Sequence, residues 1–509
     1  MMLRKIKIIL SCFVTLCLTV CILGRLTDLM ERKDSRSKYA DFFEQKDNFN
    51  VLFMGTSHVI NAVQPMELWD DYGIVSYNLG GHGNRIATTY WTMENALDYT
   101  TPDLVVIDCY SVAYSMKSYD IFSFIHLSLD AFPLSPTKVK AIWDLLDDPV
   151  LEENIASGKA KKSDEPRTKI GLLWDYSVYH SRWMELTEND FEPEENLEKG
   201  AESRINVVRS TMEKIDSSIK MKGGTLSEDY LRRMIEDCQS RGINVLLTYL
   251  PFPAPESKQR EANFISDLAE EYGVNYINFL DLDVIDLDTD CYDDTSHLNP
   301  SGARKVTAYL GDYITRNYPV MDQRHNLTYS SWYDDYREYV ELKNENLKSQ
   351  EKLKSYLMLL SGEKADIVID VRNKDLYKNE WMMDLLVNIG AAREEITENT
   401  DFIIKMNGHD KAVVIDGVRN DDPGVTNAIE TEIGTVQLNQ DWTGTEHEGE
   451  EGYYSVSVNG KEYLTGNSKD QFGLNISVSR DDMRVDTARF AYVVDPNSLE
   501  VIVSETVHE

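Results

Sequence analysis

Between residues 50 and 319, short apolar runs alternate with segments whose apolar residues recur at helical spacing. Five of the runs are rich in branched residues and bounded by Gly, Pro, Asn or Asp, as expected of strands buried on both faces of a parallel sheet. These runs cover residues 50–54, 76–79, 104–107, 245–249 and 276–279. The helical patterns cover residues 66–72, 85–97, 227–241, 258–272 and 301–318. Repeated strand, helix, strand units predict right-handed crossovers and a doubly wound α/β fold.

A long interruption, residues 111–224, separates the third predicted strand from the fourth. It contains aromatic residues and helical periodicity, so we expect an ordered insertion that helps to shape a ligand site above the sheet. Its segment Tyr179-His180-Ser181-Arg182-Trp183 is compatible with an aromatic and cationic wall for a sugar, and equally with the core of the insertion.

After residue 319 the pattern changes. Residues 331–360 read as a charged helix that serves as a spacer, and residues 361–509 as a smaller α+β accessory domain. Its predicted helix is 377–389, and its strand-like runs are 366–371, 402–406, 412–415, 473–478 and 489–494. This region has no clustered Ser, His and Asp, so a binding or packing role is expected there.

The N-terminus has the pattern of a signal sequence. Arg4, Lys5 and Lys7 precede an uncharged run over residues 8–24, and no small-x-small cleavage site follows it. We therefore predict an uncleaved, single-pass signal anchor over residues 1–30, with a cleaved signal peptide as the competing interpretation. The charge asymmetry places the domain of residues 31–320, and everything after it, outside the cytoplasm.

The net charge of the chain limits the classes of molecule that it can bind. The 509 residues include 87 acidic and 52 basic side chains, and a net charge of −35 repels phosphate backbones, so nucleic acid is an unfavourable partner. Three of the six cysteines lie in the apolar N-terminal run, which leaves too few for a disulfide framework. No Cys/His spacing fits a zinc site, and no metal or other cofactor is predicted.

A serine follows the first predicted strand directly. Gly55-Thr56-Ser57-His58 places its hydroxyl at the carboxyl edge of the sheet, where ligands bind in open α/β folds and where a helix N-terminus favours developing negative charge. A structural helix cap is the alternative role for Ser57.

A candidate general base for this serine lies near the end of the same predicted domain. Asp294 precedes His297 in a loop after the fifth predicted strand, so a carboxylate can fix the imidazole tautomer while the other ring nitrogen acts as general base. Asp293 is the second choice as the orienting carboxylate. The order Ser57, Asp294, His297 predicts a catalytic triad at one edge of the sheet.

These segments resemble the SGNH/GDSL hydrolase superfamily. Gly55-Thr56-Ser57-His58 is similar to its nucleophile block, Asp294-Thr295-Ser296-His297 to its terminal Asp-x-x-His block, and residues 77–84 to its glycine block. The resemblance spans about residues 50–319 and implies a flavodoxin-like sheet and acyl-ester chemistry through an acyl-serine. It also implies an oxyanion hole from the amides of Ser57 and of Gly80 or Gly81.

The chain departs from the family at one place. The Gly-x-Asn-Asp block expected after the third strand is replaced by Asp108-Cys109-Tyr110-Ser111. Two alternatives follow: Asn78 or Asn84 substitutes for the missing oxyanion asparagine, or the site holds its oxyanion with fewer donors. His58 and His82 flank the predicted pocket, as substrate contacts or as structural hydrogen-bonding groups.

Anchored, extracytoplasmic branches with this glycine block resemble O-acyltransferases of bacterial cell-surface polysaccharides. The resemblance implies a carbohydrate or cell-wall polymer as acceptor and a multi-span membrane acyltransferase as the acyl donor's source. Two other functions stay open: a carbohydrate acetylesterase that uses the same residues, and a non-catalytic cell-wall binding or assembly protein, which the missing asparagine block favours.

Overall fold

The structure is a computed structural model that describes residues 2–31, 33–45, 48–118, 123–160, 168–174, 176–192, 196–417, 425–441, 453–467 and 472–509. The chain forms two compact units. Unit 1 comprises Met1–Glu202, Met212–Val284 and Val306–Tyr336, and unit 2 comprises Ser203–Thr211, Ile285–Lys305 and Arg337–Glu509. This division differs from the predicted boundary near residue 320, because the segment that carries His297 groups with the C-terminal unit.

A five-stranded, fully parallel sheet forms the centre of unit 1. Its strands are β1 (Val51–Met54), β2 (Ser76–Asn78), β3 (Leu104–Asp108), β4 (Asn244–Tyr249) and β5 (Asn275–Asn278). Every residue of β1, β2 and β3 is buried, which explains the unbroken apolar runs. The spatial order β2-β1-β3-β4-β5 reverses direction between β1 and β3, where ligands bind in doubly wound sheets. The predicted α/β class and all five strands are confirmed.

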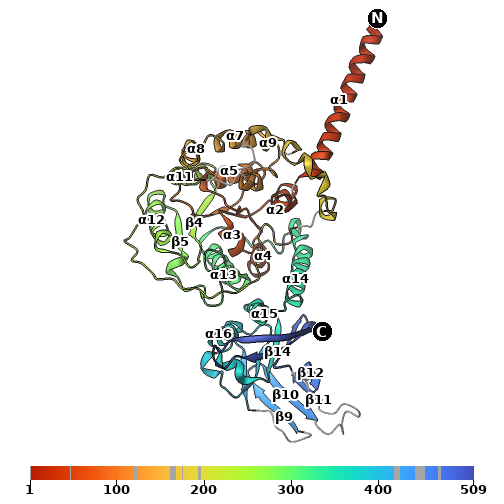
Figure 1. Ribbon diagram of the computed structural model, residues 1–509, viewed down its shortest axis with the longest axis vertical. Coiled ribbons are helices and arrows are strands. Elements are labelled where there is room, and N and C mark those ends of the chain that lie inside the picture. Colours follow the sequence, from red (N-terminus) through yellow and green to blue (C-terminus); the bar gives the residue numbers. More distant parts are fainter. Residues whose placement is uncertain are drawn as a thin grey trace. The chain divides into compact units, whose positions relative to one another are not determined.

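Helices cover both faces of this sheet. Figure 1 shows α5 and α11 on one face and α3 and α4 on the other. The helices between the strands are α3 (Ser57–Ala62), α4 (Pro65–Tyr72), α5 (Ile86–Leu97), α11 (Leu226–Ser240) and α12 (Glu256–Tyr272), with the short η3 (Phe279–Asp281) after β5. Helices α13 (Pro300–Asn317) and α14 (Trp332–Lys348) have residues in both units, and η4 (Leu327–Tyr329) lies between them.

The described part of the insertion is helical between residues 123 and 190 and irregular over residues 111–118 and 196–224. Its elements are α6 (Ser123–Leu129), α7 (Pro136–Leu145), α8 (Pro149–Ala156), α9 (Lys169–Leu173), α10 (Tyr176–Tyr179), η1 (His180–Met184) and η2 (Glu188–Asp190).

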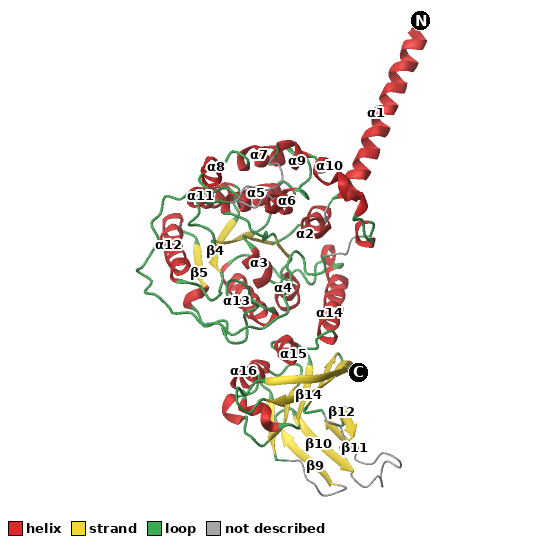
Figure 2. Cartoon of the chain, in the orientation of Figure 1, coloured by secondary structure: helices red, strands yellow, loops and turns green. Residues whose placement is uncertain are grey.

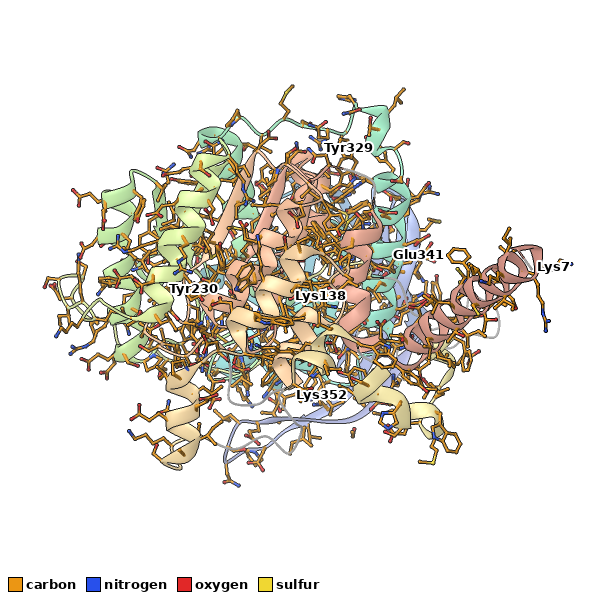
Figure 3. All side chains as sticks on the ribbon, turned by 90° about the horizontal axis from the view of Figure 1, so that it is seen from above. Lys7, Lys138, Tyr230, Tyr329, Glu341 and Lys352 are labelled. Carbon is orange, nitrogen blue, oxygen red and sulfur yellow. The ribbon has the colours of Figure 1, made fainter. Side chains whose placement is uncertain are left out.

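The N-terminal apolar run lies in the exposed helix α1 (Met2–Met30), followed by α2 (Lys33–Glu44). Residues Arg4–Met30 are long and apolar enough to cross a membrane, and none of the apolar window is buried. Figure 3 shows α1 projecting away from the rest of unit 1, with Lys7 near its free end. A helix in the core of a soluble domain would bury such a surface, so the exposed α1 is consistent with a signal anchor or a signal sequence.

Unit 2 is built on two antiparallel sheets, seen as yellow arrows in Figure 2. The six-stranded sheet has the order β15-β14-β13-β6-β7-β8, and the four-stranded sheet the order β12-β11-β10-β9. The strands are β6 (Asp366–Val371), β7 (Thr400–Lys405), β8 (Val413–Asp416), β9 (Val425–Thr431), β10 (Gly434–Asp441), β11 (Tyr453–Val458), β12 (Lys461–Asn467), β13 (Leu474–Arg480), β14 (Met483–Val494) and β15 (Val501–His508).

The six-stranded sheet has one core on each face. Ile367 and Ile369 of β6 pack in the core that also holds α15 (Leu353–Leu360) and α16 (Glu380–Ile389), whereas Val368 packs with residues of the four-stranded sheet. Two short helices, η5 (Lys374–Lys378) and η6 (Arg393–Glu395), flank α16. The predicted α+β character is confirmed, and the predicted spacer is instead two helices, of which α15 is buried in unit 2 except for Lys354.

Candidate active site

Ser57 occupies the start of α3, immediately beyond β1. Thr56 caps this helix, and its Oγ1 accepts a hydrogen bond from the His58 amide. The turn requires glycine at position 55, because a Cβ there would lie 2.5 Å from Cγ2 of Val59. From Val51 to Trp69, Ser57 is the only residue that is not buried. Along this stretch Ser57 is therefore the side chain that reaches the surface, as expected of a nucleophile above a doubly wound sheet.

The glycine block lies beside this turn, in the same unit. Gly81 donates its amide to the Gly55 carbonyl at 3.0 Å, and Gly80 donates its amide to Oδ1 of Asn78 at 3.1 Å. Both predicted amide donors are thus engaged within the loop. The resemblance implied an oxyanion hole from the amides of Ser57 and of Gly80 or Gly81, and in this structure the Gly80 and Gly81 amides donate to Asn78 and Gly55.

The two candidate asparagines have other contacts. Asn78 donates both hydrogens of its amide, to the carbonyls of Val59 and Val63, so it holds α3 against β2 and is not open to an oxyanion. Asn84 is buried, accepts a hydrogen bond from Ser128 Oγ at 2.6 Å, and packs so closely that a Cβ at Gly81 would lie 2.1 Å from its Nδ2. These asparagines shape the loop around Ser57.

The two flanking histidines differ in environment. His58 is buried, its Nδ1 lies 3.0 Å from Thr56 Oγ1, and its ring stacks on Tyr110 at 3.9 Å between centroids. His82 is partly exposed and its Nε2 lies 2.8 Å from Oε1 of Glu202. His58 therefore supports the structure of the sheet edge, and His82 is the more accessible of the two predicted substrate contacts.

Asp108 ends β3 at the place of the missing asparagine block. It is buried, Oδ1 accepts the Leu250 amide at 3.0 Å, and its Cβ would lie 3.0 Å from a Cβ at Gly55. The carboxyl group thus joins the ends of β3 and β4, and its Cβ lies close against the turn after β1. Burial raises the pKa of Asp108 to about 7, against smaller lowering effects from the Leu250 and Tyr110 amides and from Lys258.

This pKa predicts a pH-dependent stability. Between the ordinary aspartate value, about pH 4, and pH 7, the unfolded chain loses the Asp108 proton while the folded chain retains it, so stability falls as pH rises, by up to about 4 kcal/mol. Asp108→Asn keeps the acceptor for Leu250 and cannot ionise. The melting temperature of this variant is expected to rise relative to wild type as pH increases from 5 to 7.5. Thermal unfolding at both pH values checks this, and a constant difference between the two proteins would contradict it.

His297 lies in a hairpin-like loop of unit 2. Cys291 pairs with Leu298 in an antiparallel bridge, and the Tyr292 amide donates to the His297 carbonyl at 2.9 Å. His297 Nδ1 lies 2.6 Å from Oδ2 of Asp293. With Nδ1 facing Asp293, a general base at this position would act through Nε2.

The orienting carboxylate differs from the preferred prediction, because it belongs to Asp293 and not to Asp294. Oδ1 of Asp293 accepts the amides of Thr295, Ser296 and His297 at 3.0, 2.7 and 3.1 Å, so its side chain folds back over the turn. Asp294 is exposed. Burial raises the pKa of Asp293, but hydrogen bonds from His297 and from the Ser296 and Thr295 amides outweigh it and hold that pKa well below its ordinary value. The partner of His297 is therefore an ionised carboxylate.

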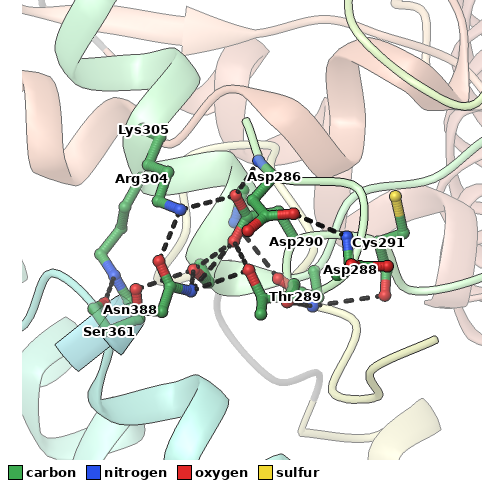
Figure 4. Close-up of polar contacts among 12 residues, drawn as sticks. Asp286, Asp288, Thr289, Asp290, Cys291, Arg304, Lys305, Ser361 and Asn388 are labelled. Atoms are coloured by element: carbon green, nitrogen blue, oxygen red, sulfur yellow. Dashed lines mark hydrogen bonds and ion pairs between the residues drawn. The ribbon is translucent and has the colours of Figure 1, made fainter. Parts of the chain in front are cut away.

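A buried polar network fixes the base of this loop, as Figure 4 shows. Asp290 is completely buried and accepts hydrogen bonds from Ser301 Oγ and Lys305 Nζ, each at 2.7 Å. Asn388 of α16 donates to Asp290 and to Ser301 and accepts from Lys305. This network was not predicted from the sequence, in which Asp290 is one of several closely spaced aspartates, with Asp286 and Asp288.

The predicted site residues thus fall into two sets. Ser57, His58, Gly80, Gly81, His82 and Asn84 belong to unit 1, and Asp293, Asp294 and His297 belong to unit 2. Within the described ranges, no group of three or more His, Cys, Asp or Glu side chains is arranged to hold a metal ion. Comparison with family models, with curated proteins and with solved structures gave no match for this chain.

Proposed function

We propose that this protein is a membrane-anchored, extracytoplasmic serine O-acyltransferase of SGNH type that acts on cell-surface carbohydrate. The observation that carries the proposal is the 2.6 Å pair between His297 Nδ1 and an ionised Asp293, which is the arrangement of a general base. Ser57, the one partly exposed residue at the end of β1, is the nucleophile. Asp293 takes the role first assigned to Asp294.

The reaction proceeds in two balanced steps. Ser57 Oγ bonds to the acyl carbon of the donor, His297 Nε2 takes the hydroxyl proton, and the donor's leaving group departs with that proton. A carbohydrate hydroxyl then attacks the acyl-serine, His297 takes its proton, and Ser57 Oγ leaves and recovers the proton. The acyl group ends on the acceptor, and the enzyme returns to its starting state.

Two features support the pairing of Ser57 with His297. The sequence segments that contain them are similar to the nucleophile and terminal blocks of one superfamily. In addition, α13 begins at Pro300, three positions after His297, and runs without a break. Thr307 of this helix donates its Oγ1 hydroxyl to the carbonyl of Ala62. Ala62 is the last residue of α3, the helix that begins at Ser57.

The anchor completes the proposal. An exposed, apolar α1 with Arg4, Lys5 and Lys7 ahead of its apolar run is typical of a single-pass signal anchor with a cytoplasmic N-terminus. We propose that the acyl group reaches Ser57 from a multi-span membrane acyltransferase, and that the acceptor is a carbohydrate or cell-wall polymer.

The transfer reaction is tested by product analysis. The purified full-length chain is incubated with a chromogenic acetyl ester, with and without an oligosaccharide acceptor, and acetylated sugar is measured by mass spectrometry beside free acetate. We expect acetylated sugar to form at the expense of free acetate as acceptor is added, because the acyl-serine partitions between water and sugar. Free acetate without acetylated sugar would identify an esterase, and no turnover above background would favour a non-catalytic protein.

A further inference from the structure

The insertion of unit 1 exposes a set of large apolar side chains that a water-soluble surface rarely presents together. We name it the aromatic patch: Ile170, Trp174, Trp183, Met184 and Phe191. Their exposed fractions lie between 43% and 70%. The patch belongs to the short elements α9, η1 and η2 and to the residues beside them, and none of its members takes part in the proposed chemistry.

The aromatic patch is attached to the end of α1. Trp174 donates its indole N–H to Thr27 Oγ1 at 3.3 Å. Arg182, next to Trp183, donates to the carbonyl of Met30 at 2.7 Å and to that of Glu31, and its other nitrogen pairs with Asp190 at 2.8 Å. Figure 2 shows α10 beside the base of α1. The insertion thus lies at the point where the apolar helix ends.

The hydrogen bond to Thr27 fixes the position of the aromatic patch along the axis of α1. The uncharged run of α1 ends at Gly24, and Thr27 lies three residues further, about 4.5 Å along a helix axis. The polar headgroup layer of each leaflet is on the order of 5–7 Å thick. When α1 spans a bilayer, a tryptophan hydrogen-bonded to Thr27 would therefore lie at the depth of the headgroups, where tryptophan is enriched in membrane proteins.

We propose that the aromatic patch rests in the headgroup layer of the membrane that α1 spans, so that unit 1 contacts the bilayer a second time. The inference rests on the proposed anchor but not on the proposed chemistry. Asp190 neutralises Arg182, so the contact is apolar and does not require anionic lipid. Two attachments restrict the rotation of unit 1 about α1 and hold it at a fixed height over the membrane.

Tryptophan quenching by lipid tests this contact. The full-length chain is placed in phosphatidylcholine nanodiscs, with or without bromine near the headgroup end of the acyl chains. Bromine quenches indole fluorescence only at contact. We expect bromine to quench part of the wild-type emission, and the variant with Trp174→Tyr and Trp183→Tyr to lose most of that quenching. Leu327→Trp is the matched control, since Leu327 is highly exposed in unit 1 outside the patch, and its added emission is expected to stay unquenched.

A second measurement in the same nanodiscs distinguishes two results: that the aromatic patch does not contact lipid, and that α1 is not inserted in the bilayer. Cys12, Cys17 and Cys21 lie in α1 and are shielded from a membrane-impermeant maleimide only if α1 is in the bilayer. Shielded cysteines with equal emission in brominated and ordinary lipid would overturn the proposal, retain the anchor, and assign the patch to a protein partner. Reactive cysteines would overturn the anchor itself.

Discussion

Ser57→Ala is expected to lower turnover of an acyl ester by about 10⁵- to 10⁶-fold, because removing the nucleophile disables all the residues that act with it. The melting temperature is expected to change little, since Ser57 is partly exposed and the N-cap of α3 is Thr56. Steady-state kinetics and thermal unfolding of wild type and variant measure the two effects.

The matched control is Ser227→Ala, which removes another serine hydroxyl at the start of a helix in unit 1. It is expected to leave turnover within about twofold of wild type, as for most substitutions away from a reacting group. Comparable activity in Ser57→Ala and Ser227→Ala would remove Ser57 from the mechanism.

A large loss of turnover is also expected when Asp293, but not its neighbour Asp294, is replaced by asparagine. Asp293→Asn is expected to lower turnover by about 10³- to 10⁴-fold, because the imidazole loses the anion that fixes its tautomer and stabilises its protonated form. The asparagine oxygen still accepts the three backbone amides of the turn, so the loop keeps its shape. Steady-state kinetics of the purified variants give the ratio.

Asp294→Asn is the control for the same loop. This side chain is exposed, and its removal is expected to change turnover by no more than about twofold. If Asp294→Asn were the damaging change and Asp293→Asn the neutral one, the hydrogen bond between Asp293 and His297 would not be the catalytic arrangement.

Much of unit 1 could be predicted from the sequence because its strands are buried on both faces. β1, β3 and β4 read as short, mainly apolar runs bounded by turn formers, and each observed strand lies within a few residues of its predicted range. The predicted helices were equally close, since an apolar stripe at helical spacing identifies a helix that covers a sheet on one side.

Unit 2 was predicted less completely for a physical reason. β9, β10, β11, β12 and β15 were missed, and they belong to sheets with a more exposed face or edge. In β10, Val436 and Leu438 point into the core while Gln437 and Asn439 alternate with them, so no continuous apolar run marks the strand. Alternation of this kind over a short segment is a weak signal.

The candidate active site could also be predicted only in part from the sequence. Position after a strand and the Asp-x-x-His spacing identified Ser57 and His297, but two adjacent carboxylates were within reach of one imidazole. The turn decides between them, because three backbone amides converge on Asp293. The contact between Asp290 and Asn388 joins residues 98 positions apart, and only the folded unit brings them together.

The central claim is that Ser57 is a nucleophile activated by His297, and mapping a covalent adduct tests it most directly. The full-length chain is treated with a serine-directed phosphonate, digested, and analysed by mass spectrometry. The account predicts the added mass on the peptide that contains Ser57, and adduct formation about 10²- to 10⁴-fold slower in His297→Ala. An adduct on another residue, or equal labelling rates in wild type and His297→Ala, would contradict it.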